Sequence, residues 1–157
     1  MVTHKDKFRL TGEWLQSNLQ NLRDKDDNPV FKKVLLGFDS NKVKTYGGKA
    51  IAVTYVTGTK EYNETFGRHN RPQYIESVVG FVIKDHTEAK YQEAVQIMDL
   101  LHEEFETNND WFELRDPTDN TKIVRATFIT DSVLTLQPTG KQLDIIGVFT
   151  LRHHIYK

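Results

Sequence analysis

The side chains with the widest chemical repertoire in this sequence are its six histidines, because imidazole ligates metals and transfers protons near neutral pH. The run His102–Glu104 begins like a zinc-binding helix motif, which requires a second histidine four residues after the first. That position is occupied by Glu106, so the motif is incomplete. His153 and His154 are adjacent on a predicted strand and therefore point to opposite faces, which hinders them from binding one ion. We expect no metal site and interpret the histidines as solvated or at the edge of the core.

A magnesium-dependent nuclease would need two or three carboxylates and a lysine around the metal. Glu88 and Lys90 have the E-x-K spacing found in such sites. They fall at the predicted start of a helix, however, where capping and the helix dipole already explain Glu88. The strand before them adds only Lys84 and Asp85. We keep a metal-dependent nuclease-like enzyme as an alternative, and it is not the preferred interpretation.

Motifs for nucleotide binding and for nucleophilic catalysis are missing from the sequence. Gly47, Gly48 and Gly58 lack the spacing that would place several backbone N–H groups on one phosphate, and no Gly-x-Ser-x-Gly elbow occurs. The chain has no cysteine, which removes thiol nucleophiles, disulfides, zinc ribbons and iron–sulfur clusters. We therefore expect a protein that is not an enzyme and that uses no cofactor.

The polar stretch 58–72 is the least core-like part of the sequence and is longer than an ordinary loop. In and just after it, cations suited to phosphates occur beside aromatic rings suited to bases, namely Tyr62, Phe66, Arg68, His69, Arg71 and Tyr74. Glu61 and Glu64 lie among them, and the flanking residues add little positive charge. We therefore favour a loop that orders against a protein partner, with a small nucleic-acid-binding module as the alternative.

Charge is unevenly distributed, although the net charge is only −1. Residues 1–50 have ten basic and six acidic side chains, whereas residues 91–116 have one basic and eight acidic side chains. The simplest interpretation is a solvated helix face followed by a loop. The alternative is that opposite patches on copies of the protein meet head to tail. On that basis we name as candidate partner-contact residues Tyr62, Phe66, Arg68, His69, Arg71, Glu103, Glu104 and Glu106.

Two helices are predicted from the hydrophobic period. Leu15, Leu19 and Leu22 indicate a helix over about 11–23, with Thr11 as its N-cap. A longer amphipathic helix is predicted over about 87–107, capped by Asp85 or Thr87, and its apolar face consists of Tyr91, Ala94, Ile97, Met98, Leu101 and Phe105.

Strands are predicted where β-branched and aromatic residues cluster without a helical period, over 30–38, 50–56, 73–84, 111–114, 123–130, 132–136 and 143–155. Gly58 is expected to end the second of them, and the turn before the last is expected at 138–140. Strands in clusters with helices between them predict a single α+β domain over residues 1–157, with a mainly antiparallel sheet and both helices on one face. We expect no membrane association, because no signal-peptide-like or membrane-spanning run occurs.

The order of these elements, with a strand-rich end at Phe149–Lys157, resembles the tail terminator (tail completion) and minor tail proteins of long-tailed phages and prophages. The resemblance implies a structural protein, made in the host cytoplasm and built into the virion tail. It further implies a homo-oligomeric ring, commonly of six copies, that caps the tail tube and joins it to the head connector. The implied partners are the tail tube protein and the head–tail connector protein; nucleic acid, cofactors and catalysis are not implied.

Overall fold

The computed structural model describes residues 4–37, 50–61 and 73–155. The helices are α1 (His4–Asn21) and α3 (Glu88–Thr107), followed by the 3-10 helix η1 (Asn109–Trp111). The strands are β1 (Lys33–Leu36), β2 (Ile51–Glu61), β3 (Gln73–Ile83), β4 (Leu114–Arg115), β5 (Lys122–Val124), β6 (Ala126–Thr139) and β7 (Gln142–Ile155). The predicted α+β class is confirmed.

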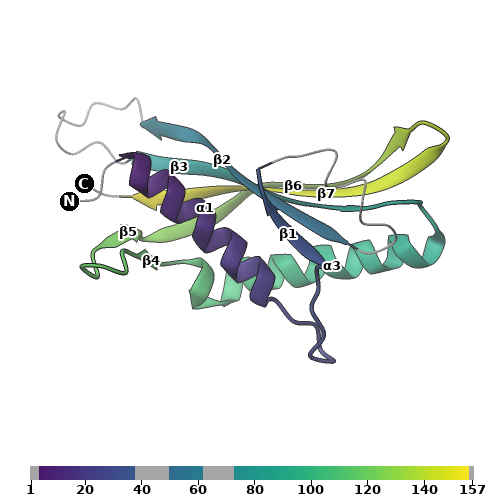
Figure 1. The fold of residues 1–157 in the computed structure, drawn as a ribbon, viewed down its shortest axis with the longest axis horizontal. Helices are drawn as coiled ribbons and strands as arrows, with labels where there is room; N and C mark the ends of the chain where they lie inside the picture. Colours follow the sequence, from purple (N-terminus) through teal and green to yellow (C-terminus); the bar gives the residue numbers. More distant parts are fainter. Residues whose placement is uncertain (1–3, 38–49, 62–72, 156–157) are drawn as a thin grey trace.

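Five strands form one sheet in the order β1-β2-β3-β7-β6. The β1–β2 pair is parallel and the other three pairs are antiparallel, so the sheet is mainly antiparallel as predicted. Strands β4 and β5 form a separate two-stranded ribbon. In Figure 1 the β6–β7 hairpin extends as a long arm at the end of the molecule opposite the β4–β5 ribbon.

The main core lies between the sheet and the two helices. Helix α1 packs on β1 and β2, and α3 packs on β6 and β7. Alternate residues of the two central strands face the helices and are fully buried, among them Val79, Phe81, Ile83, Ile145, Phe149 and Leu151. This alternation confirms the predicted buried face of the last strand, and it places both helices on one side of the sheet. A second apolar cluster, Leu35, Ile51, Val53 and Val82, lies on the opposite face.

The first helix begins earlier than predicted. Thr11 is not its N-cap, because it lies within α1 and its hydroxyl donates to the Lys7 carbonyl at 2.7 Å. The residues before it contain no helix breaker, and Phe8 and Leu10 pack on a small cluster around Ile75. At α3, Thr87 is the N-cap, accepting from the Lys90 N–H at 3.2 Å.

Several predicted strand limits are wrong. Gly58 does not end β2, because a bulge between Val56 and Gly58 lets the strand continue to Glu61. The polar stretch predicted to be a loop from residue 58 therefore starts as strand, and 62–72 lie outside the described residues. The first predicted strand, 30–38, is reduced to β1, since only Lys33–Leu36 pairs with β2.

The strand-like interpretation of 111–114 is also wrong for its first three residues, because strand β4 begins at Leu114. Trp111 belongs to η1, where its ring packs edge-on against Phe105 with the centroids 4.7 Å apart. The two predicted strands 123–130 and 132–136 are divided differently: residues 123–124 belong to β5, and the break expected at 131 is absent because 126–139 form one continuous strand, β6. The turn after it is Gly140–Lys141 and not 138–140, and the positive φ of Gly140, 65°, suits the first position of a two-residue hairpin turn.

Gly147 allows the sheet and α3 to approach closely. A Cβ added there would overlap the Phe81 ring and come within 2.9 Å of the Met98 sulfur. We expect Gly147→Ala to lower the free energy of unfolding by about 1–3 kcal/mol, because the overlap forces neighbouring side chains out of their rotamers. Urea unfolding measures this. In a Phe81→Leu background the ring is gone and the penalty should shrink; an equal penalty in both backgrounds would contradict the explanation.

Candidate interaction surface

Strand β6 forms one edge of the sheet. Within the described residues it pairs only with β7. The backbone N–H and C=O groups of alternate residues on its outer side are therefore free to pair with a further strand. Natural proteins usually protect such an edge with charged side chains, proline or a bulge.

The protective features of β6 are confined to its ends. A bulge between Ile129 and Asp131 lies near the beginning of the strand, and Pro138 lies near its end. The six residues between them, Ser132–Gln137, contain no charged side chain. We call Ser132–Gln137 the open edge run. An edge that is unprotected over such a length is a template for strand addition.

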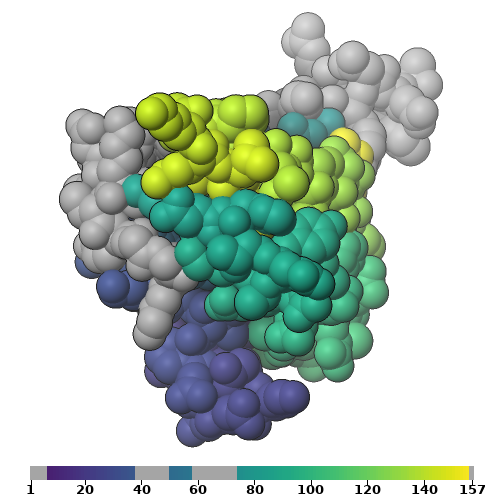
Figure 2. Space-filling view, turned by 90° about the vertical axis from the view of Figure 1, so that its right-hand side faces the viewer, coloured from purple at the N-terminus to yellow at the C-terminus, as the bar shows by residue number. Residues whose placement is uncertain are grey.

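A shallow groove lies between the open edge run and α3. It has a volume of about 570 Å³ and is lined by His86, Tyr91, Leu134, Thr135 and Leu136. Tyr91 and Leu136 are each 40% exposed, so apolar surface is available at the edge itself. Figure 2 looks onto this end of the molecule and shows the hairpin lying against α3. Backbone pairing groups beside apolar pockets are the two components of β-strand recognition.

The two walls of the groove are fixed to each other. His102 on α3 and Ser132 on β6 form a hydrogen bond between Nε2 and Oγ at 3.0 Å. The His102 ring also packs edge-on against Phe149, with the centroids 5.0 Å apart. A preformed groove loses little conformational entropy when it binds a strand.

The candidate acids predicted from sequence occupy different environments. Glu103 and Glu106 are exposed on α3, and a Glu106 oxygen lies 4.0 Å from His102 Nδ1. Glu104 is half-buried, and its carboxylate accepts from Asn108 at 2.8 Å and from the Trp111 indole at 3.1 Å. Glu104 thus fastens the end of α3. The other five candidates, Tyr62, Phe66, Arg68, His69 and Arg71, lie outside the described residues.

His153 is the one histidine with a triad-like environment in the described part of the chain. Its Nε2 lies 2.5 Å from the Ser77 hydroxyl and its Nδ1 lies 2.9 Å from the Thr127 hydroxyl. His153 and Ser77 are 0% exposed and Thr127 is 2% exposed, so no substrate reaches them. Burial, followed by the charge of neighbouring His154, lowers the pKa of His153 to about 3. This group is a satisfied core histidine.

A polar cluster lies near the end of β7 on the sheet face away from the helices, which we call the open face. The Arg152 guanidinium lies 4.1 Å over the Tyr74 ring, and its Nη2 is 3.6 Å from Glu76. Tyr74 is only 8% exposed, so the ring proposed for base stacking is covered. His154 is on this face while His153 is on the other, which confirms their predicted opposite orientation.

The described residues contain no group of three His, Asp or Glu side chains arranged to hold a metal ion. A larger hollow of about 670 Å³ lies beside residues 28–32, and among the described residues Lys32 and Glu93 are the only charged side chains lining it. Within the described ranges no helix is long and apolar enough to cross a membrane. No family model matches the chain, and a search of curated proteins found no match either.

The sequence interpretation missed the open edge run and its groove. The signal was present, because 132–137 contains only apolar, hydroxyl and amide side chains, none charged, and is followed by Pro138. That pattern predicts a strand, but it does not say whether the strand is central or at an edge. The neighbour of β6 is decided by the pairing of distant strands, which a local pattern does not record.

His153 should make the fold sensitive to acid. Because its pKa is about 3 in the folded state and its ordinary value is 6.5, only the unfolded chain takes up this proton between those values. The free energy of unfolding should therefore fall by about 2 kcal/mol from pH 6.5 to pH 5 through this residue. Urea unfolding at both pH values measures the loss. His153→Gln should remove most of this pH dependence and His154→Gln should keep it; an unchanged slope in His153→Gln would contradict the assignment.

Proposed function

We propose that this protein is a structural assembly protein whose copies join into a closed ring. The observation that carries the proposal is the open edge run, a strand edge without charge that contains exposed Leu136 and lies beside exposed Tyr91. Unprotected edges of this kind lead to uncontrolled association unless a defined partner covers them. Pairing with another copy would cover the edge and bury the groove.

A ring follows from the difference between the two edges of the sheet. Among the described strands, the sheet ends in β6 on one side and in β1 on the other. A contact between unlike surfaces is heterologous, and repeated contacts of that type form a ring when the rotation between copies closes. The uneven charge of the chain favours the same head-to-tail arrangement, since residues 1–50 are basic and residues 91–116 are acidic.

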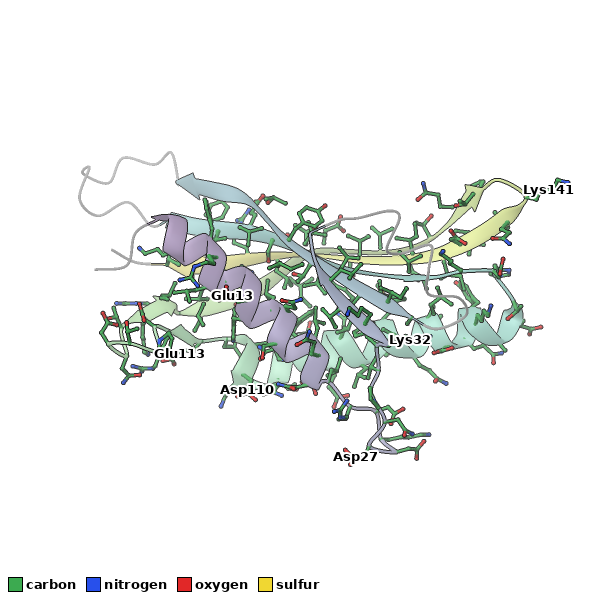
Figure 3. The ribbon with its side chains drawn as sticks, in the orientation of Figure 1. Glu13, Asp27, Lys32, Asp110, Glu113 and Lys141 are labelled. Atoms are coloured by element: carbon green, nitrogen blue, oxygen red, sulfur yellow. The ribbon has the colours of Figure 1, made fainter. Side chains whose placement is uncertain are left out.

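Within that class we propose the role of a tail terminator, which would cap the tail tube and present a surface to the head–tail connector. The element order and the final long strand support this assignment through the resemblance to that family. The projecting hairpin offers a further contact for a tube or a connector, and Lys141 marks its tip in Figure 3. This role needs no cofactor and no catalytic group.

Light scattering of the purified chain, alone and with tail-tube subunits from the same phage or prophage, tests the proposal. We expect a mass that is a multiple of 18.3 kDa, with ring-shaped particles in negative-stain electron microscopy. A chain that stays monomeric under both conditions would rule the ring out.

Leu136→Asp should reduce assembly at least tenfold, because it places a charge on the open edge run. Leu143→Asp is the matched control, since Leu143 has a similar exposure of 41% but lies on β7, where it pairs with Pro138 and is not on the outer edge. Both variants are compared with the wild type by light scattering across a concentration series. Equal loss of assembly in the two variants would count against β6 as the contact.

A further inference from the structure

The opposite edge of the sheet has an exposed apolar side chain of its own. Strand β1 pairs only with β2 among the described residues. Leu36, its last residue, is 49% exposed and lies against Gly12 of α1, where an added Cβ would be 3.2 Å from Leu36 Cδ1. Leu36 pairs with Thr54, which faces the helices. Because paired residues share a face, Leu36 lies on the same side of the sheet as the groove.

The strand directions allow the two edges to join. β1 runs parallel to β2, and each of the next three pairings reverses the direction. β6 is therefore antiparallel to β1. When a second copy is placed beside the first in the same orientation, its β1 meets β6 as an antiparallel partner, which is the more stable pairing.

We propose that β1 of a second copy adds to the open edge run of the first, so that the sheet continues from copy to copy with Leu36 in the groove. The inference rests on the proposed ring and specifies its contact. β1 has four residues and the open edge run has six, so the whole of β1 fits between the bulge and Pro138. Val34 and Leu36 would then lie on the same face as Leu134 and Leu136.

Charge on the two surfaces is complementary. The donor segment 30–37 contains Lys32 and Lys33 and no acidic side chain. The acceptor surface, formed by α3 from residue 91 onward and by β6 from 131 to 137, contains no lysine or arginine. Its exposed acids include Asp99, Glu103, Glu106 and Asp131. Opposite potentials steer the heterologous contact and disfavour pairing of two acceptor surfaces with each other.

Both surfaces are preformed. The Gln16 side chain donates to the Val34 carbonyl at 3.2 Å, and the Gly37 N–H donates to the Thr54 carbonyl at 2.8 Å, so β1 is fastened to α1 and to β2. The acceptor groove is fastened by the bond between His102 and Ser132. Joining them therefore requires no rearrangement of the described backbone.

A mixing experiment tests which edges meet. Leu36→Asp damages only the donor and Leu136→Asp damages only the acceptor. Each variant alone should be monomeric, and an equimolar mixture should form a one-to-one dimer, because only one intact interface remains. Light scattering should give about twice 18.3 kDa. Full assembly of Leu36→Asp alone would overturn the proposal and indicate pairing of β6 with β6; a mixture that stays monomeric would overturn it as well.

Two further variants protect the test against misfolding. Lys33→Glu leaves the apolar contacts intact. Lys33 pairs with Ile51 and lies on the sheet face away from α3, so the charge reversal acts through the field of the whole edge. It should weaken assembly severalfold at low salt, with a smaller effect at high salt. Tyr55→Asp is the matched control, because Tyr55 is 41% exposed but lies on β2, within the sheet, and should assemble like the wild type. Equal melting temperatures confirm folding. If the wild type assembles but the two variants form no dimer when mixed, this contact alone is refuted. If the wild type never assembles, the ring and this contact are refuted together.

Discussion

The pairing of β3 with β7 is the interaction on which the rest of the structure depends. It runs from Gln73↔Ile155 to Ile83↔Ile145 with no change of register. Since side chains alternate along a strand, this register decides which residues face the helices. A shift of β7 by one residue would place Phe149 on the open face and move Arg152 into the core.

One polar group is built into this pairing. His153 occupies a core position on β7, where an apolar side chain would be expected from the alternation. Its two ring nitrogens are satisfied by Ser77 on β3 and Thr127 on β6, and the edge of the Trp14 ring lies against it, with the centroids 5.8 Å apart. The imidazole thereby links both strands that flank β7, and α1 covers it. A buried polar group that is fully satisfied adds specificity to the register because a shifted strand would leave it unpaired.

Much of the fold could be predicted from the sequence, because its elements have strong periods. The long helix and the buried face of β7 follow from the spacing of residues such as Ala94, Leu101 and Phe149. The errors have local causes. A bulge after Val56 extends a strand past Gly58, and the breaker-free residues before Thr11 extend a helix. The interaction surface was less predictable, because the edge position of β6 depends on β7 inserting beside β3, a pairing between segments about sixty residues apart in the chain.

The position of β7 also explains why the sheet keeps an open edge. β7 lies between β3 and β6, so the strand that follows β6 in the sequence pairs with its inner side, and the outer side of β6 has no strand partner among the described residues. Helix α3 contacts β6 through His102 on one face of the sheet. It does not cover the backbone groups on the outer edge of β6. A bulge at one end of the run and a proline at the other confine pairing to a short length. Such limits suit a partner strand of matching length better than open-ended aggregation, because a longer strand would meet both obstacles. In the proposed ring each copy supplies that short strand from its opposite edge, so assembly and protection of the edge are the same event.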